Sequence, residues 1–186
     1  MTTFILGLIL FFATHFFTAV MRPQRQALVA KLGEMPFKGL FGIISIIGFV
    51  LIVLGWPQAD ATSLYLPPDF LRHATYALML ISIILLVAAY APAGRIAPAV
   101  QHPMLAGVKV WAFAHLLSNG EVRSVLLFGS FLAFAIVDRI AVKKRKVSVR
   151  ARGPVRNDIL VIIIGIVVYL IIAHYLHQYI AGVDLY

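Results

Sequence analysis

The chain has 186 residues, of which 62% are hydrophobic and only 12% charged, and 16 Lys and Arg against 7 Asp and Glu give it a formal charge of +9. Soluble domains average about 45–50% apolar and about 25% charged residues, so this composition indicates a membrane protein and excludes a disordered chain or a soluble nucleic-acid-binding protein. The absence of cysteine excludes disulfides, iron–sulfur clusters, thiolate zinc sites and cysteine nucleophiles.

Six stretches are apolar enough to approach the roughly 20 residues that a helix needs to cross about 30 Å of hydrocarbon. In chain order they run from about 4 to 21, 40 to 56, 70 or 75 to 91, 104 to 117, 124 to about 142, and 159 to 180. The fourth is the weakest, because its apolar run is short and contains Lys109 and His115, and a re-entrant or interfacial helix is the alternative there. We predict an all-α, polytopic membrane bundle of six transmembrane helices that forms one domain over residues 1–186.

The basic residues alternate from one loop to the next. Thirteen of the 16 Lys and Arg residues lie in the segments 22–39, 92–103 and 139–156, whereas the opposite loops hold only Arg72 and Arg123. The positive-inside rule places the basic segments in the cytosol and both termini outside, which is the periplasm for an inner-membrane protein of a Gram-negative bacterium. The N-terminus has no basic region or cleavage site, so we expect the first helix to be a retained span. The basic run near 143–156 lacks interleaved aromatic residues, which favours contact with anionic membrane lipids over nucleic acid.

Small residues recur at helical spacing on two predicted spans. Gly48 and Gly55 lie on the second, and Gly129 and Ala133 lie on the fifth. Small side chains let backbones approach where lipid offers no hydrophobic drive to associate, so we expect ordinary helix contacts at both pairs.

Two histidines lie inside predicted spans, where ionisable groups are costly and usually functional. His15 lies on the first span and His115 on the fourth, with Trp111 one turn before His115. The helix face around His15 consists of apolar and small residues that a flat macrocycle can rest against: Gly7, Phe11, Thr18 and Ala19. Two neutral imidazoles on different helices are a standard way to hold haem iron. A hydrogen bond from His15 to a neighbouring helix is the alternative.

The other histidines lie nearer the predicted membrane boundaries. His73 begins the third span and His102 precedes the fourth, where a solvated histidine is ordinary. His174 and His177 share a face of the last span, where they can bind metal or belong to an interfacial belt with nearby tyrosines.

A few charged side chains are candidates for anion binding near the membrane. Arg72, Arg123 and Lys109 are placed to hold haem propionates or another anion, and Lys109 can equally pair with Asp138. The chain has no glycine-rich phosphate loop, no HExxH zinc motif and no Gly-x-Ser-x-Gly elbow.

Several segments resemble the NnrU family of bacterial membrane proteins. The most specific is HPMLAGVKVWAFAHLLSNG over residues 102–120, and the others are 6–15, 22–33, 71–73, 126–131 with 138–139, and 153–158. The resemblance covers nearly the whole chain. It implies an association with nitrite and nitric oxide reduction in denitrification, where members of the family are linked to the production of active reductases.

A more distant resemblance is to the zeta-carotene isomerase of plants and cyanobacteria, a membrane haem protein that isomerises a central cis double bond. By motif, its haem-binding histidines match His15 and His115, which implies a b-type haem. Its cysteine in the same block corresponds to Ala112, and the basic residue that usually precedes the His-Pro pair is replaced by Gln101. These departures leave haem binding in place and count against the isomerase chemistry.

We therefore predict a b-type haem held between the first and fourth helices by His15 and His115. The further cofactor-binding residues that we predict are Lys109, Trp111, Arg72 and His102. The expected role is redox, sensing or maturation in nitrogen-oxide respiration, beside respiratory membrane partners. One alternative is a haem-dependent cis–trans isomerase of a carotenoid or another lipid-soluble polyene. The second is a non-haem transporter or assembly factor, against which the lack of a repeat or broken-helix pair argues.

Overall fold

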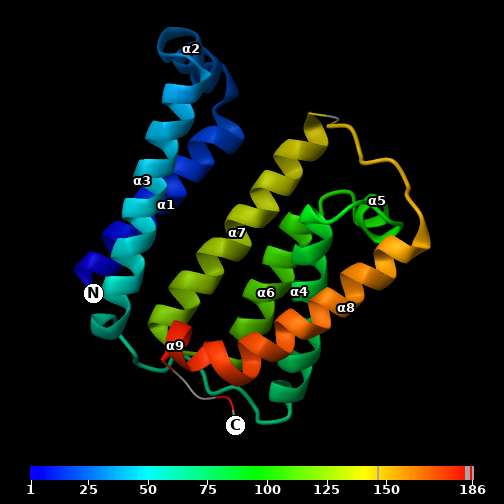
Figure 1. Cartoon of the computed structure of the whole chain (residues 1–186). Helices are drawn as coiled ribbons and strands as arrows, with labels where there is room; N and C mark the ends of the chain where they lie inside the picture. The colour runs from blue at the N-terminus through cyan, green and yellow to red at the C-terminus, as the bar shows by residue number, and fades with distance from the viewer. Residues whose placement is uncertain (146, 183–184, 186) are drawn as a thin grey trace. The chain divides into compact units, whose positions relative to one another are not determined.

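The computed structural model describes residues 1–145, 147–182 and 185. This part of the chain is helical, with no β-strand beyond one bridge between Ser63 and Glu121. Among these residues, five helical segments are long and apolar enough to cross a membrane: Thr2–Val20, Glu34–Gln58, Leu71–Tyr90, Val122–Lys144 and Val155–Ala181. The protein is thus an all-α, multi-pass membrane protein (Figure 1). Its chain divides into two compact units.

The first unit contains α1 (Thr2–Val20), α2 (Arg22–Leu32), α3 (Glu34–Gly55), the short 3-10 helix η1 (Trp56–Gln58) and α7 (Val122–Lys144). Helices α1 and α3 pack with their backbones in close contact, as Figure 1 shows. A Cβ atom added at Gly48 would lie 2.7 Å from the Phe11 nitrogen, and one added at Gly7 would lie 2.6 Å from the Ile52 nitrogen. One added at Gly55 would meet the backbone of Phe4. The close packing predicted for Gly48 and Gly55 is confirmed.

Aromatic side chains fill the core of the first unit. The buried cluster is formed by Phe4, Leu8, Phe12, Ile52 and Ala59. Two rings from α7 pack against it, and the Phe12 and Phe131 rings meet edge to face at 4.9 Å. Edge-to-face pairs stabilise a core beyond the area they bury.

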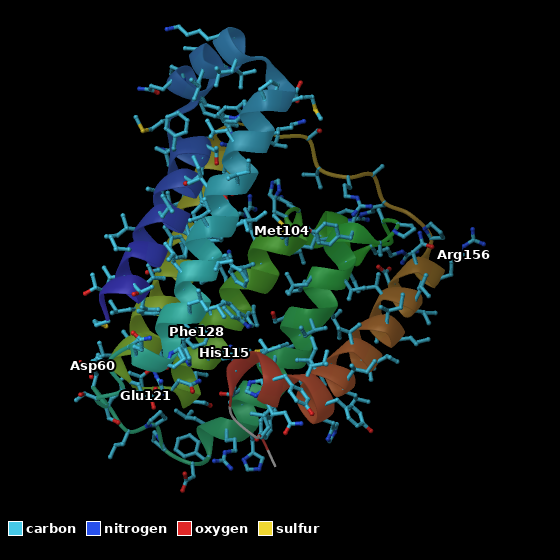
Figure 2. The ribbon with its side chains drawn as sticks, turned by 60° about the vertical axis from the view of Figure 1, so that its left-hand side comes forward. Asp60, Met104, His115, Glu121, Phe128 and Arg156 are labelled. Carbon is cyan, nitrogen blue, oxygen red and sulfur yellow. The ribbon has the colours of Figure 1, made fainter. Side chains whose placement is uncertain are left out.

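A loop ties α3 to the start of α7 at one end of the first unit. The backbone nitrogen of Arg123 donates to the Asp60 carbonyl at 3.0 Å, and that of Val122 donates to the Thr62 carbonyl at 2.9 Å. Figure 2 shows Asp60 and Glu121 at this end. Hydrogen bonds from the Thr62 side chain and then from its backbone lower the pKa of Asp60.

The second unit contains α4 (Leu71–Tyr90), α5 (Ile96–Val100), α6 (Pro103–Ser118), α8 (Val155–Ile171), the π-helical segment η2 (Ile172–Leu176) and α9 (His177–Ala181). Helices α4 and α6 run antiparallel and are joined by polar contacts along their length. The Thr75 hydroxyl donates to the Ala114 carbonyl at 3.1 Å, and the Ser82 hydroxyl donates to the Gly107 carbonyl at 2.8 Å. Helix α6 has 16 residues and is therefore about 24 Å long, shorter than the helices that span a membrane unaided.

The first turn of α8 and the segment before it bind the loop after α4 in the second unit. The Asp158 carboxylate accepts hydrogen bonds from the Arg95 nitrogen at 2.8 and 2.9 Å and from the Ile96 nitrogen at 3.0 Å. The Asn157 amide donates to the Ala93 carbonyl at 2.8 Å. The Arg150 guanidinium donates to carbonyls at the end of α4: those of Ala88, Ala89 and Ala91. The motif over residues 153–158 thus has a structural role.

Candidate functional site

His15 lies in the first unit, in a pocket of aromatic rings. It stacks on Phe11 of its own helix, with ring centroids 4.1 Å apart and an interplanar angle of 26°. Phe41 of α3 lies 5.2 Å away, and Phe134 of α7 meets the imidazole edge to face at 5.5 Å. The imidazole is half-buried, and these rings limit the rotamers open to it.

The hydrogen bond of His15 is made within α1. Its Nδ1 lies 2.7 Å from the Phe11 carbonyl oxygen. The alternative, a bond to a neighbouring helix, therefore does not hold for this nitrogen. A carbonyl oxygen only accepts, so Nδ1 carries the proton and the lone pair of the neutral ring lies on Nε2.

His115 lies in the second unit near the end of α6, where Figure 2 labels it. Its Nδ1 lies 2.9 Å from the Trp111 carbonyl oxygen, and the two rings are 5.1 Å apart at 56°. The hydrogen bond matches that of His15, whereas the two rings here are tilted rather than stacked. Both histidines bond the carbonyl four residues earlier and lie against the aromatic side chain of that same residue.

This arrangement prepares an imidazole to bind a metal. A ligating histidine almost always donates its other N–H to a carbonyl or carboxylate, which fixes the tautomer and raises the basicity of the ligand nitrogen. In both His15 and His115, the Nδ1 bond leaves Nε2 as the nitrogen that could hold a metal. The described residues contain no group of three or more His, Asp or Glu that could hold a metal ion. A haem asks less of the protein, because the porphyrin supplies four nitrogens and the protein one or two axial ligands.

The apolar face predicted beside His15 is only partly available. The backbone of α3 occupies the space beside Gly7, and the Phe11 ring covers the imidazole. Any ligand of the His15 Nε2 therefore meets aromatic rings rather than the small-residue wall that we predicted. Phe41 and Phe134 were missed from the sequence because they come from other helices.

The charged residues predicted to hold an anion have different surroundings. Arg72 is exposed in the first turn of α4. Arg123 is engaged already, since its Nε donates to Glu121 Oε2 at 2.7 Å and its guanidinium lies 4.7 Å from the centre of the Trp56 ring. Lys109 is half-buried on α6 and forms no hydrogen bond or ion pair among the described residues. Asp138, its predicted alternative partner, lies 3.5 Å from Arg145.

His102 follows a strained turn. Gln101 has a φ of 67°, and the His102 nitrogen donates to the Val100 carbonyl at 2.9 Å, which closes a γ-turn of the rare positive-φ form. The His102 carbonyl then accepts the first hydrogen bond of α6, from the Ala106 nitrogen at 3.1 Å. The half-buried His102 thus begins the helix that carries His115.

The two histidines of the last span differ in exposure. His174 is exposed and lies in the π-helical segment, whereas His177 is half-buried at the start of α9. His177 lies close enough to His115 to act on it electrostatically. Nothing in the sequence pairs these two helices, so this proximity was missed. His73 is exposed, as expected for a solvated histidine.

Comparison with known proteins identifies the chain. No curated protein and no solved structure matches it. The model of the NnrU family, described as "NnrU protein", matches residues 3–185 and so covers both structural units. The resemblance inferred from the sequence motifs is confirmed. The chain belongs to the NnrU family.

Proposed function

We propose that this protein is an inner-membrane haem protein of nitrogen-oxide respiration, in which His15 and His115 would be the residues that hold a b-type haem. The observation that carries the proposal is the shared geometry of the two histidines. Each has its Nδ1 within hydrogen-bond distance of its own helix, at 2.7 and 2.9 Å, and so presents Nε2 as the ligand atom.

The surroundings of each histidine fit this ligand role. Aromatic rings from three helices lie against His15, and Ala112 and Ala114, on the helix of His115, are 0% exposed. When bound, a b-type haem supplies an iron that exchanges one electron or holds a small ligand. The protein's own part is to fix the tautomers of the two histidines.

The α4–α6 pair supports a sixth membrane crossing. Helix α6 stays beside the spanning helix α4 from Thr75, which bonds Ala114, to Tyr90, whose hydroxyl lies 3.5 Å from the sulfur of Met104. A helix too short to span the bilayer alone can lie within the membrane when protein rather than lipid covers its polar side chains. Six crossings agree with the alternating basic loops, and with the positive-inside rule they would put both termini in the periplasm.

The family association with nitrite and nitric oxide reduction supports a redox, sensing or maturation role with respiratory membrane partners. The isomerase alternative lacks support at one position. Ala112 is 0% exposed and has no atom that can bind iron or exchange with a ligand. Deletion of the gene in a denitrifying host, with complementation by wild type and by His115→Ala, tests the role in nitrite and nitric oxide reduction. We expect nitrite or nitric oxide reduction to be restored by the wild type only.

Absorbance spectra of the purified full-length protein test haem binding. We expect a Soret band in the wild type, and loss of haem or conversion to a five-coordinate spectrum in His15→Ala and in His115→Ala. His73→Ala and His174→Ala are matched controls, because both histidines are exposed, and should keep the wild-type spectrum. His177→Ala tests the imidazole that acts on His115.

Two results would overturn the proposal. The first is a wild-type protein, expressed with haem supplied, that shows no Soret band. The second is a band that survives unchanged in both ligand variants. Loss of the band in His115→Ala and His177→Ala but not in His15→Ala would mean that the second unit holds the iron without His15.

A further inference from the structure

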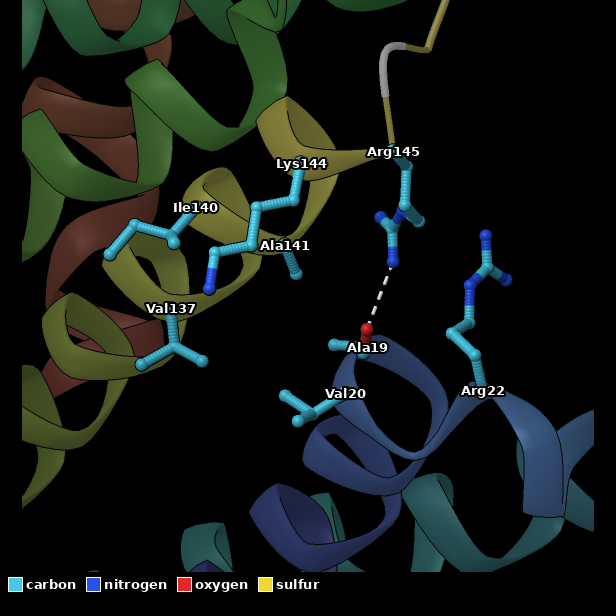
Figure 3. Close-up of a pocket in the computed structure, with 8 residues that line it drawn as sticks. All are labelled: Ala19, Val20, Arg22, Val137, Ile140, Ala141, Lys144 and Arg145. Carbon is cyan, nitrogen blue, oxygen red and sulfur yellow. Dashed lines mark hydrogen bonds between the residues drawn. The ribbon is translucent and has the colours of Figure 1, made fainter.

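A pocket of about 370 Å³ opens in the first unit between the C-terminal ends of α1 and α7 (Figure 3). Its floor is apolar, and it includes Val20 of α1 and Ile140 of α7. Three cationic side chains line it: Arg22, Lys144 and Arg145. The pocket thus joins a hydrocarbon-like wall to a cluster of positive charge.

The positive charge of this pocket is only partly balanced. Arg145 donates from Nη1 to the Ala19 carbonyl at 2.9 Å, and its Nη2 lies 3.5 Å from Asp138. Its Nε is buried without a hydrogen-bond partner among the described residues. Arg22 and Lys144 form no hydrogen bond or salt bridge within the described chain. Asp138 offsets one of these three cations, which leaves an excess of two positive charges.

The neighbouring charges act on Arg22. Burial, and then the positive charges of Arg145 and Arg25, lower the pKa of Arg22, while Asp138 raises it. Like charges held this close repel each other, and an anion placed among them would relieve the repulsion.

The position of the pocket selects the kind of anion. Both α1 and α7 are long and apolar enough to cross the membrane, so their ends lie at its surface. Val20 is 53% exposed and Ile140 is 51% exposed beside the cations. A free inorganic anion gains nothing from such an apolar wall. A phospholipid has acyl chains beside a phosphate, which matches the apolar wall beside the cations.

We propose that this pocket binds the headgroup phosphate of an anionic phospholipid, whose acyl chains lie along the ends of α1 and α7. Arg22 and Lys144 hold the phosphate. Arg145 fixes the position of α1 relative to α7 at the pocket, because it contacts both Ala19 of α1 and Asp138 of α7. The proposal does not depend on haem binding.

Lipid binding to the full-length protein in detergent, measured by native mass spectrometry, tests this site. The probe is dioleoylphosphatidylglycerol, with dioleoylphosphatidylcholine as the neutral comparison. The pocket variant is Arg22→Gln with Lys144→Gln. The control is Lys31→Gln with Lys143→Gln, which removes the same charge from exposed positions on α2 and α7 outside the pocket. Lys144→Gln alone, at an exposed residue, serves if the double variant does not fold.

We expect the pocket variant to lose about 30-fold in affinity for phosphatidylglycerol, since each basic side chain near a membrane surface contributes about 1 kcal/mol. The control should stay within about twofold of the wild type, and phosphatidylcholine should bind weakly to all three proteins. Equal losses in the pocket variant and the control would overturn the proposal in favour of diffuse surface charge. Competition by millimolar inorganic phosphate would overturn it in favour of a free-anion site.

Discussion

Both units of this protein contain membrane-spanning helices, but the helices inside each unit are held by different interactions. In the first unit, glycines let α1 and α3 touch backbone to backbone, and aromatic rings fill the rest. In the second unit, hydroxyl and carboxylate groups bond to the backbone of the neighbouring segment, as Ser82 and Asp158 do. Lipid tails are as apolar as leucine, so helices in a membrane associate through packing or through polar contacts. The first unit relies mainly on packing, whereas the second adds these polar contacts to close helix packing at Gly107 and Gly165.

The difference has a consequence for the two candidate ligands. His15 lies among rings that hold it by shape, whereas His115 lies on a helix whose position depends on hydrogen bonds from Thr75 and Ser82. Loosening the packing should disturb His15 first, and loosening the polar contacts should disturb His115 first. The chain offers a reporter for each, because its two tryptophans, Trp56 and Trp111, belong to different units.

The largest effect is expected from Asp158→Ala. The change removes three charge-assisted contacts to the nitrogens of Arg95 and Ile96 and leaves two backbone donors without a partner. We expect a loss of about 3 kcal/mol or more in the free energy of unfolding. Detergent unfolding of a Trp56→Phe background, followed by Trp111 fluorescence, measures this effect in the second unit.

Asp69→Ala is the matched control for Asp158. It removes the same charge from an exposed position in the second unit, where only the backbone carbonyl of Asp69 accepts a hydrogen bond. Its stability should stay within about 0.5 kcal/mol of the wild type. Equal losses in the two variants would mean that charge, rather than the hydrogen bonds, matters.

The next effect is expected from Gly48→Val in the first unit. The new side chain meets the backbone of Phe11, so α1 and α3 must separate. Overpacking of this kind costs about 1–3 kcal/mol. The loss should be read by Trp56 in a Trp111→Phe background. Gly42→Val, on the same helix with nothing within 4 Å, should leave the midpoint unchanged.

These glycines also show how far the sequence predicts the structure. Spacing on the second span predicted close packing at Gly48 and Gly55 correctly, but the same reasoning failed at Gly129, where an added Cβ would meet nothing within 4 Å. A small residue permits a close approach without showing which helix approaches. The five long spans were equally readable, because a membrane span is a local property of composition.

The candidate site was predictable only in part for the same reason. The Nδ1 bonds of His15 and His115 are local, since each reaches a carbonyl four residues away on the same helix. The rings of Phe41 and Phe134, the proximity of His177 to His115 and the pocket at Arg145 all depend on how helices pair. A single sequence does not encode that pairing in any short pattern.

A smaller effect is expected when a buried serine is replaced by alanine, and each unit offers one such serine. Ser82 is 0% exposed and its hydroxyl donates to Gly107, whereas the buried hydroxyl of Ser45 on α3 has no partner among the described residues. Ser82→Ala should lower the free energy of unfolding by about 1 kcal/mol, and Ser45→Ala should leave it unchanged or raise it. A destabilised Ser45→Ala protein would show that the first unit also depends on polar contacts.

The smallest effect is expected from Arg150→Gln. Its guanidinium closes the end of α4 by donating to the Ala91 carbonyl at 2.7 Å and to two carbonyls before it at 3.3 Å. Positive charge at a helix C-terminus contributes about 0.3–1 kcal/mol, and because Arg150 is exposed, salt should screen part of this contribution. The Trp111 unfolding midpoint of Arg150→Gln should therefore approach the wild-type value at high salt, while the deficit of Ser82→Ala persists because that bond is buried. If salt does not reduce the loss of stability in Arg150→Gln, the packing of the Arg150 side chain rather than its charge stabilises the end of α4. The second unit would then depend on packing as the first unit does.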